Sequence, residues 1–308
     1  MPIVVNTNSA ATSASFNLSK ANEALRKSLA RLSSGNRITS PAEDAGGLAV
    51  AYKLDSHAKR TEAVLNNHQN ALSYLQLQDS ALQTVGDAVS RMSELRTMAA
   101  DVTKNSSDIE NYSKEFRELQ SQINQMALEK FNGISLFAFG GDQADKLATS
   151  GKDLNVTPGT GYDDTFSYTL LTHPSGVATD GSISLAVFNL EHITSLDIAG
   201  QAGDSLAKAN GNETASITTV GIDMFTEIIQ RIADARAENG AEQQRVNTSY
   251  NLHSQNLVNI EAARGRIMDA DIAMESTRFA RNNVLVQASA SMTAQANQLT
   301  NVALTLLQ

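Results

Sequence analysis

Five histidines are the residues of this chain best able to exchange protons or bind a metal ion near neutral pH. They are His57, His68, His173, His192 and His253, and no two of them have the HExxH spacing that places two imidazoles on one helical face beside a glutamate. The chain has no cysteine, which excludes a disulfide, a thiolate metal site and a cysteine nucleophile. We therefore predict no metal site and no cofactor.

Motifs that hold phosphate groups or present a nucleophile are also absent. The chain lacks the GxxxxGKS/T and GxGxxG loops that cradle phosphates, and the GxSxG turn that presents a serine. Asp163 and Asp164 could together bind a cation, but two adjacent acidic residues in a polar stretch are more simply interpreted as a turn. The sequence predicts that the protein is not an enzyme.

The composition favours long helices packed side by side. Of the 308 residues, 41% are hydrophobic but only 5% are aromatic, and lengthwise helix seams need small and medium side chains. The net charge of −9 argues against nucleic acid as a partner, because phosphate binding requires a basic face. No stretch is long enough for membrane insertion, and residues 1–16 lack the basic head of a cleaved secretory signal. By these rules alone the protein would be soluble and cytoplasmic.

Residues 277–308 carry the clearest helical pattern. Apolar and small residues recur there at alternating steps of three and four, which predicts a helix whose seam packs lengthwise against other helices. The predicted seam consists of Leu285, Ala288, Met292, Ala296, Leu299, Ala303 and Leu306. Its outer positions are mostly uncharged polar residues, so an isolated chain would leave one face of this helix uncovered.

A second seam of the same kind lies near the N-terminus. It consists of Leu18, Ala21, Leu25, Ser28 with Leu29, and Leu32. Two striped helices at opposite ends of one chain indicate that the termini come together, while the polypeptide runs out and back between them.

A long helix is predicted to follow the first one. Ser40 is its expected N-cap, Pro41 its first residue, and Glu43 reaches back to the Ser40 amide. Its apolar positions continue to Val102, which gives a length of about 90 Å at roughly 1.5 Å per residue. A helix of this length predicts an elongated bundle.

Two more helices complete the predicted helical part. A shorter helix carries apolar residues from Tyr112 to Met126, and a long return helix runs from Ile222 to Ile267. Polar residues in the middle of the return seam, such as Gln243 and His253, are typical of positions that set helix register. Residues 268–271 are the expected hinge before the last helix.

Residues 139–220 have a different composition, in which Gly, Thr, Asp and Ser are frequent. The alternating runs at Thr165–Leu171 and 182–190 predict strands bounded by turns. The predicted fold is therefore mainly α: an elongated antiparallel coiled-coil or helical bundle formed by the N- and C-terminal arms, with a small, mostly β outer module in the middle.

Several motifs in the helical segments resemble those of bacterial flagellins. They lie at residues 29–35 with Ile38, 40–46, 131–133, 259–271 and 294–298. The similarity extends over residues 8–136 and 221–308. The resemblance implies that residues 1–40 and 271–308 are the two halves of an inner coiled-coil layer, that 41–138 and 221–270 form the rod-like helical domain, and that 139–220 are a variable outer module.

The resemblance also implies a function, which is that of a structural subunit polymerising into the helical filament of the bacterial flagellum. Flagellins are exported unfolded by the flagellar type III apparatus without a cleaved signal, so an extracellular location in the filament is expected instead of a cytoplasmic one. The implied partners are further copies of the chain, an export chaperone and the export apparatus, and the hook-associated junction and cap proteins.

A host Toll-like receptor that reads flagellins is a further partner implied by the resemblance. The receptor-contact pattern Arg-x-x-Glu-Leu is matched here by Arg91, Glu94 and Leu95, with Glu115 at the corresponding site on the next helix. Three neighbouring residues depart from the usual pattern, and one of them adds a positive charge that could weaken docking: Ser93, Arg96 and Thr97.

Three other interpretations compete with the filament subunit. The first is the hook–filament junction protein of the same family, against which the complete run at 261–271 and the ending at 294–298 argue. The second is an enzyme carried on the outer module, such as a metallopeptidase insert, against which the missing HExxH argues. The third is a generic coiled-coil adaptor, which would explain the heptads but not the motif at 40–46.

Overall fold

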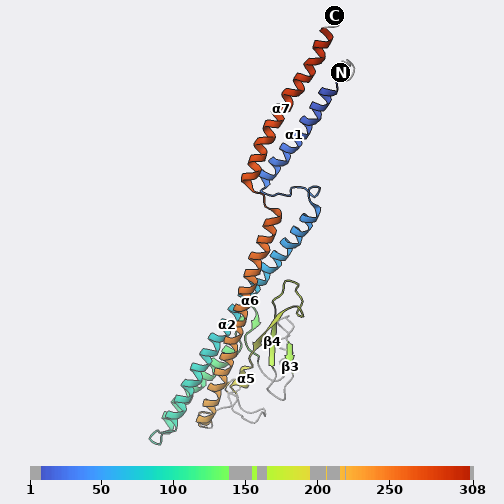
Figure 1. Cartoon of the computed structure of the whole chain (residues 1–308). Helices are drawn as coiled ribbons and strands as arrows, with labels where there is room; N and C mark the ends of the chain where they lie inside the picture. The colour runs from blue at the N-terminus through green and yellow to red at the C-terminus, as the bar shows by residue number, and fades with distance from the viewer. Residues whose placement is uncertain are drawn as a thin grey trace. The chain divides into compact units, whose positions relative to one another are not determined.

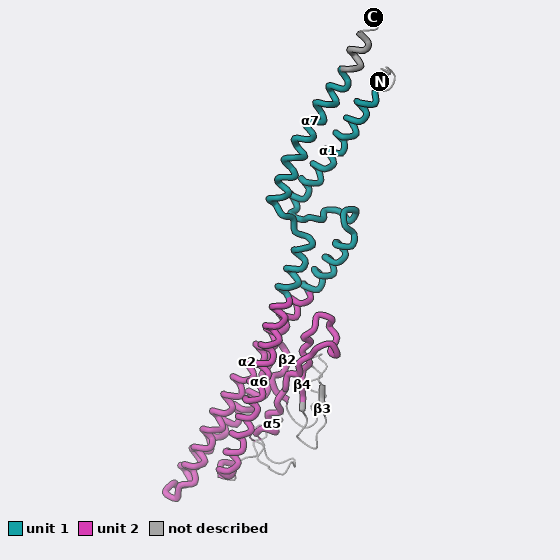
Figure 2. Tube along the Cα trace, viewed as in Figure 1, with its two compact units in different colours: residues 1–59, 257–308 teal, residues 60–256 magenta. Residues whose placement is uncertain are grey.

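The computed structural model describes residues 8–138, 155–157, 165–194, 206, 216–218 and 220–305. The chain divides into two compact units, one built from both ends of the chain and the other from its continuous middle (Figure 2). Unit 1 contains Met1–Lys59 and Leu257–Gln308, and unit 2 contains residues 60–256.

Unit 1 is dominated by two helices that lie side by side and run antiparallel, α1 (Ser9–Ser34) and α7 (Ile272–Thr305) (Figure 1). The Asn8 side chain caps α1 by accepting a hydrogen bond from the Ala11 amide at 3.0 Å. Gly35 ends the helix in the left-handed conformation, with φ +70°. The prediction that the helices at the two ends of the chain pair with each other is confirmed.

In unit 1 the loop that follows α1 lies against the break that separates two later helices, α6 (Ile222–Met268) and α7. The helix α6 ends where the hinge was predicted, and α7 begins four residues later at Ile272. The Ala270 amide donates to the Gly35 carbonyl at 2.9 Å. The Arg37 guanidinium donates two hydrogen bonds to the Ile267 carbonyl, at 3.0 and 2.8 Å. These bonds tie the loop after α1 to the end of α6.

The predicted start of the long helix is wrong. The helix α2 (Ala45–Ala99) begins after Asp44, whose side chain accepts a hydrogen bond from the Gly47 amide at 2.8 Å. Ser40, Pro41 and Glu43 form a turn before the helix, with a bond from the Glu43 amide to the Ser40 carbonyl. The Glu43 carboxylate accepts from the Thr39 amide instead of the Ser40 amide, because it is also held by cations from α1.

Unit 2 packs its helices around one apolar core. The helices are α2 from residue 60 onwards, α3 (Ser106–Ala127), the short α5 (Leu190–Ile193), and α6 up to residue 256. The rings of Phe116 on α3 and Phe225 on α6 meet edge to face at 6.3 Å. The fully buried core side chains include Leu75, Leu82, Val85, Val89, Met92, Leu95, Phe116, Ile123 and Phe225.

The strands of unit 2 form a hairpin and a small sheet. The hairpin pairs β1 (Lys130–Phe131) with β2 (Ile134–Ser135) through a turn in which Asn132 and Gly133 both have positive φ. The sheet is antiparallel and has the order β3 (Asn155–Thr157), β4 (Thr165–Leu171), β5 (Ser182–Val187).

The first predicted strand, Thr165–Leu171, has the observed bounds of β4. The second ends at Val187 instead of residue 190, because Asn189 caps the helix α5. The prediction of a mainly α chain with a small β region in the middle is confirmed.

Candidate functional site

The α1 face of the terminal helix pair is the one that the sequence predicted. Leu18, Ala21, Leu25, Ser28 and Leu32 are buried or half-buried, and they alternate in steps of three and four. The Asn282 amide on α7 donates to the Ser28 hydroxyl at 3.2 Å, and the Asn8 amide donates to the Ala296 carbonyl at 2.9 Å. Leu29 is the exception, because 56% of it is exposed.

The α7 face of the pair is not the predicted apolar stripe. The described side chains that are buried or half-buried on α7 are Glu275, Phe279, Asn282, Val286, Ser289, Thr293 and Ala296. This seam is displaced by one residue from most of the predicted one, which is a rotation of about 100° around the helix axis. Leu285 and Met292 are 48% and 66% exposed, and Ala288 is exposed as well.

The last four residues of the predicted stripe are Ala296, Leu299, Ala303 and Leu306. Ala296 is buried and belongs to the stripe and to the observed seam. The side chains of Leu299 and Ala303, and the whole of Leu306, lie outside the described residues. The α7 helix therefore joins α1 through small and polar side chains together with the half-buried Phe279 and Val286. It leaves Leu285, Ala288 and Met292 uncovered by the described part of the chain.

A cluster of charges joins the loop before α2 to the terminal helix pair. Lys27 and Arg31 on α1 pair with Glu43 at 2.8 and 3.4 Å. Arg31 also approaches Glu275 on α7 at 3.8 Å, and Arg278 pairs with Glu275 at 3.2 Å. The hydrogen bond from Lys27 is the main cause that lowers the pKa of Glu43 to about 2, and the Thr39 amide and Arg31 act in the same direction.

The residues predicted to contact a receptor are only partly available for binding. Arg91 donates to Glu115 on α3 at 2.7 Å and to Glu94 at 2.9 Å, and all three side chains are exposed. Leu95 is fully buried in the core of unit 2. As a surface contact Leu95 was wrongly predicted, since its side chain points toward the core that α2 shares with its neighbours.

A buried chain of amides in unit 2 was only partly anticipated. Gln243 donates to Asn239 at 2.6 Å, Asn239 donates to Gln78 at 2.6 Å, and Gln78 donates to the carbonyl groups of Leu136 and Ala186. The polar residue Gln243 in an apolar seam was the signal for this network. Its partners could not be read from the sequence, because the carbonyl acceptors belong to loop and strand backbone.

Glu242 connects α6 with the sheet of unit 2. Both of its carboxylate oxygens accept from the Ala186 amide on β5, at 2.9 and 3.1 Å. Burial raises the pKa of Glu242 to about 7, although the hydrogen bond from Ala186 opposes this shift. Nothing in the sequence pattern distinguished this glutamate from the exposed ones.

Two of the histidines meet between α2 and α6. His68 is fully buried, with one ring nitrogen 2.7 Å from the Val64 carbonyl and the other 2.9 Å from the Ser249 hydroxyl. Its ring lies 5.6 Å from that of His253, whose pKa is lowered by burial and by the neighbouring His68. Across the residues that the structure describes, no three His, Asp or Glu side chains gather as a metal ion would require. Asp163 and Asp164 fall outside them.

A helix that crosses a membrane must be both long and apolar. None of the helices in the described ranges combines the length and the apolar character that crossing a bilayer requires.

These features define a class of protein: a mainly helical chain whose two ends pair along one seam and leave Leu285, Ala288 and Met292 exposed within the described residues. Family models agree with this class. The model of the bacterial flagellin N-terminal helical region matches residues 5–140, and that of the bacterial flagellin C-terminal helical region matches residues 222–307. The chain belongs to the bacterial flagellin family.

Individual relatives match along nearly the whole chain. The flagellar filament 33 kDa core protein of Treponema phagedenis is 30% identical over 312 residues, covering 99% of this chain and 100% of the relative. The flagellin of Bacillus subtilis is 30% identical over 313 residues, covering 99% of each. A solved structure described as a flagellar hook-associated protein of Vibrio parahaemolyticus has 15% identity and a TM-score of 0.53, covering 74% of this chain and 100% of that one. At this identity the last likeness concerns the fold alone.

Proposed function

We propose that this chain polymerises into the flagellar filament through the exposed stripe Leu285, Ala288 and Met292 on α7. Fully burying a leucine or methionine side chain stabilises an assembly by about 1.5–3 kcal/mol. The α1 partner does not cover these side chains, so the stabilisation is available to contacts with neighbouring subunits.

Export in an unfolded state is the second part of the proposal. The seam between α1 and α7 contains Ser28, Asn282 and Ser289, and its larger apolar side chains, such as Leu25 and Phe279, are only half-buried. Because such a seam is weak, the terminal helices can separate for passage through the type III apparatus with an export chaperone. They would fold again on joining the filament outside the cell, where burial offsets the ordering entropy.

The other partners follow from the same location. The hook-associated junction and cap proteins would meet the terminal helices at the two ends of the filament. A Toll-like receptor that reads the predicted face would contact Arg91, Glu94 and Glu115. These three side chains are exposed, and Arg91 is paired with both glutamates. The hook–filament junction protein of the same family is the second candidate, because the likeness in fold to a hook-associated protein does not separate the two roles.

Seeded assembly tests the proposal on a double variant, Leu285→Gln with Met292→Gln. Purified monomer is incubated with fragmented filaments, and the products are examined by electron microscopy. The unchanged protein should form long helical tubes, and short closed rings would instead favour the junction protein. The double variant should remain monomeric.

A matched control separates lost assembly from lost folding. Gln298→Ala changes another exposed position of α7 and should assemble normally. Both variants should melt like the unchanged monomer, since the replaced side chains are exposed within the chain. Filaments formed normally by the double variant would refute a role for the stripe.

A further inference from the structure

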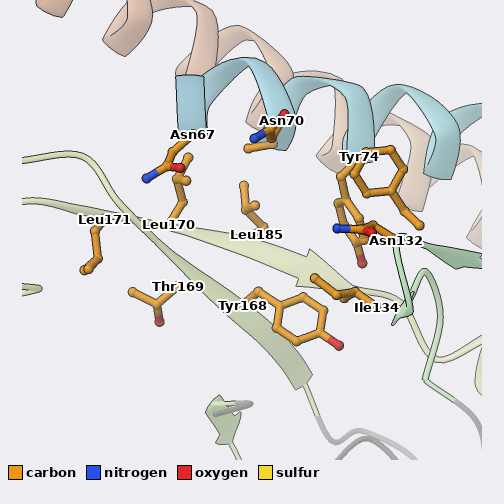
Figure 3. A pocket seen from close by; sticks show the side chains of 12 residues that line it. Asn67, Asn70, Tyr74, Asn132, Ile134, Tyr168, Thr169, Leu170, Leu171 and Leu185 are labelled. Carbon is orange, nitrogen blue, oxygen red and sulfur yellow. The ribbon is translucent and has the colours of Figure 1, made fainter. Parts of the chain in front are cut away.

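A cavity of about 470 Å³ opens in unit 2 between α2, the β1–β2 hairpin and the strands β4 and β5 (Figure 3). Its size falls within the range of about 300–1,000 Å³ that is usual for small-molecule sites. No residue of the terminal helix pair lines it, so the proposed polymerisation leaves the cavity without a role.

The inner surface of the cavity is apolar and well supported. Ala71, Tyr74, Tyr168 and Leu185 line it and are buried. The Tyr74 ring meets Tyr168 and Phe131 edge to face, each at 6.2 Å. The Tyr74 hydroxyl is fixed by donating to the carbonyl of the hairpin strand β2 at 3.1 Å. The inner surface is therefore preorganised to receive an apolar face of a ligand.

The rim of the cavity carries three asparagines. Asn67 and Asn70 are separated by about one turn of α2 and so share a face of that helix. Asn132 lies in the tight turn of the hairpin. All three are exposed, and within the described part of the chain none of their amides has a hydrogen-bond partner. Each amide supplies one acceptor oxygen and two donor hydrogens, so the rim can both donate and accept.

The lining excludes a charged ligand. Among the twelve lining residues there is no carboxylate, amine, guanidinium or imidazole, and burial raises the pKa of Tyr74 above its usual value. A charge placed here would lose its hydration without gaining a counter-charge. The occupant must therefore be neutral.

The polar groups of the lining favour a small ligand over an extended peptide. The strand β5 pairs with β4 along the cavity, and its Ala186 amide is taken by Glu242. The strand β3 pairs with β4 only at residues 165–167, beside the cavity. A peptide that adds as a further strand is held by backbone groups along an edge, whereas the exposed polar side chains that line this cavity are three asparagines and Thr169.

We propose that the cavity binds an uncharged mono- or disaccharide. The C–H face of a sugar ring packs on the apolar surface of Tyr168 and Leu185. Its hydroxyl groups, which donate and accept, bond with the amides of Asn67, Asn70 and Asn132. This lining favours a ligand that is neutral, has one apolar face, and carries both donors and acceptors along its edge.

The test uses the full-length monomer and two neutral probes, maltose and N,N′-diacetylchitobiose. Saturation-transfer NMR and the asparagine side-chain amide resonances report binding, with glucuronate and glucosamine as charged counterparts. A neutral probe should bind with millimolar affinity, corresponding to about −4 kcal/mol, and should shift the amide signals. The double variant Asn67→Ala with Asn70→Ala should weaken binding at least tenfold.

Asn66→Ala is the matched control, because Asn66 is exposed on the same turn of α2 but does not line the cavity. It should bind like the unchanged protein, and both variants should keep the same melting temperature. Ala71→Met, which narrows the cavity without touching the amides, should also reduce binding. Absence of saccharide binding up to about 10 mM, equal binding by the double variant, or a preference for charged sugars would each overturn the proposal.

Discussion

Single side chains hold the loop after α1 in place, and Glu43 is the centre of this arrangement. It accepts from Lys27, Arg31 and the Thr39 amide. Its carboxylate joins the loop before α2 to two cations of α1. The position of this loop therefore depends on Glu43, whereas Asp44 caps the start of α2.

Replacing Glu43 with glutamine should destabilise unit 1 by about 1–2 kcal/mol, because charged hydrogen bonds become neutral ones. The pKa of Glu43 is about 2 in the folded chain, against its ordinary value of 4.5. The stabilisation should thus be complete above about pH 4.5 and be lost as the pH falls toward 2. Urea unfolding at several pH values measures this, with Glu23→Gln on the exposed face of α1 as the control. An identical pH profile for Glu43→Gln and the unchanged protein would contradict it.

The histidine pair gives a second pH dependence, in unit 2. The pKa of His253 is lowered in the folded chain, so the unfolded chain binds protons more readily. Stability should be fully present above the ordinary histidine pKa of about 6.5 and should decrease as the pH falls below it.

His253→Gln should flatten this decrease, because it removes the group that gains a proton on unfolding. The measurement is urea unfolding at pH 7.5 and about 5.5, followed through the helical signal. His57→Gln, which changes a histidine of unit 1, should keep the decrease. A slope that persists unchanged in His253→Gln would assign the pH dependence to other groups.

Between elements, the amide chain of Gln243, Asn239 and Gln78 fixes α6 relative to α2 and the strands. Asn239 and Gln78 are fully buried, and a buried polar group that loses its partner costs about 1–3 kcal/mol. Apolar residues could slide past one another along such a seam. The amide chain permits one register, as polar residues in helical seams commonly do.

Asn239→Ala should therefore lower the free energy of unfolding of unit 2 by about 1–3 kcal/mol, since the Gln78 carbonyl oxygen loses its donor. Asn251→Ala, an exposed change on the same helix, should change it by less than about 0.5 kcal/mol. Chemical denaturation followed by circular dichroism compares the two. Equal stability of both variants would show that the amide chain contributes nothing.

At the scale of the whole molecule, the two units differ in what they need from other subunits. Unit 2 contains a continuous apolar core drawn from α2, α3, α6 and the strands. In unit 1 the buried apolar residues within the described ranges are few, namely Ala21, Ile38, Ala51, Ala58 and Ala296. Unit 2 therefore has a core of its own within one chain, whereas under the proposed polymerisation the terminal helices would gain most of their burial from neighbouring subunits.

Deleting residues 277–308 should leave a soluble, partly folded monomer that no longer polymerises. The core of unit 2 should persist, and proteolysis should remove α1, which has lost its partner. Circular dichroism, limited proteolysis and seeded electron microscopy test the three parts of this expectation. Filaments grown from the truncated chain would refute the role given to α7.

Much of the fold could be predicted because helical and strand periodicities are local properties of the sequence. Alternating steps of three and four identified the α1 seam, and alternating polar and apolar residues located β4 with its observed bounds. The break between α6 and α7 was also predicted correctly.

The predicted boundaries between segments lie in or beside helix breaks, at 40/41 and 270/271. The two compact units divide instead within α2 and α6, at 59/60 and 256/257. The five-segment division therefore remains a prediction.

By itself the sequence determined which segments are helical, that the two ends pair, and which family the motifs resemble. Only the tertiary structure decided which face of each helix meets its partner. A one-residue change of phase leaves the heptad spacing intact but turns Leu285 and Met292 outward. The cavity at Asn67, Asn70 and Asn132 was likewise invisible in the sequence, because its walls come from segments that only the folded chain brings together.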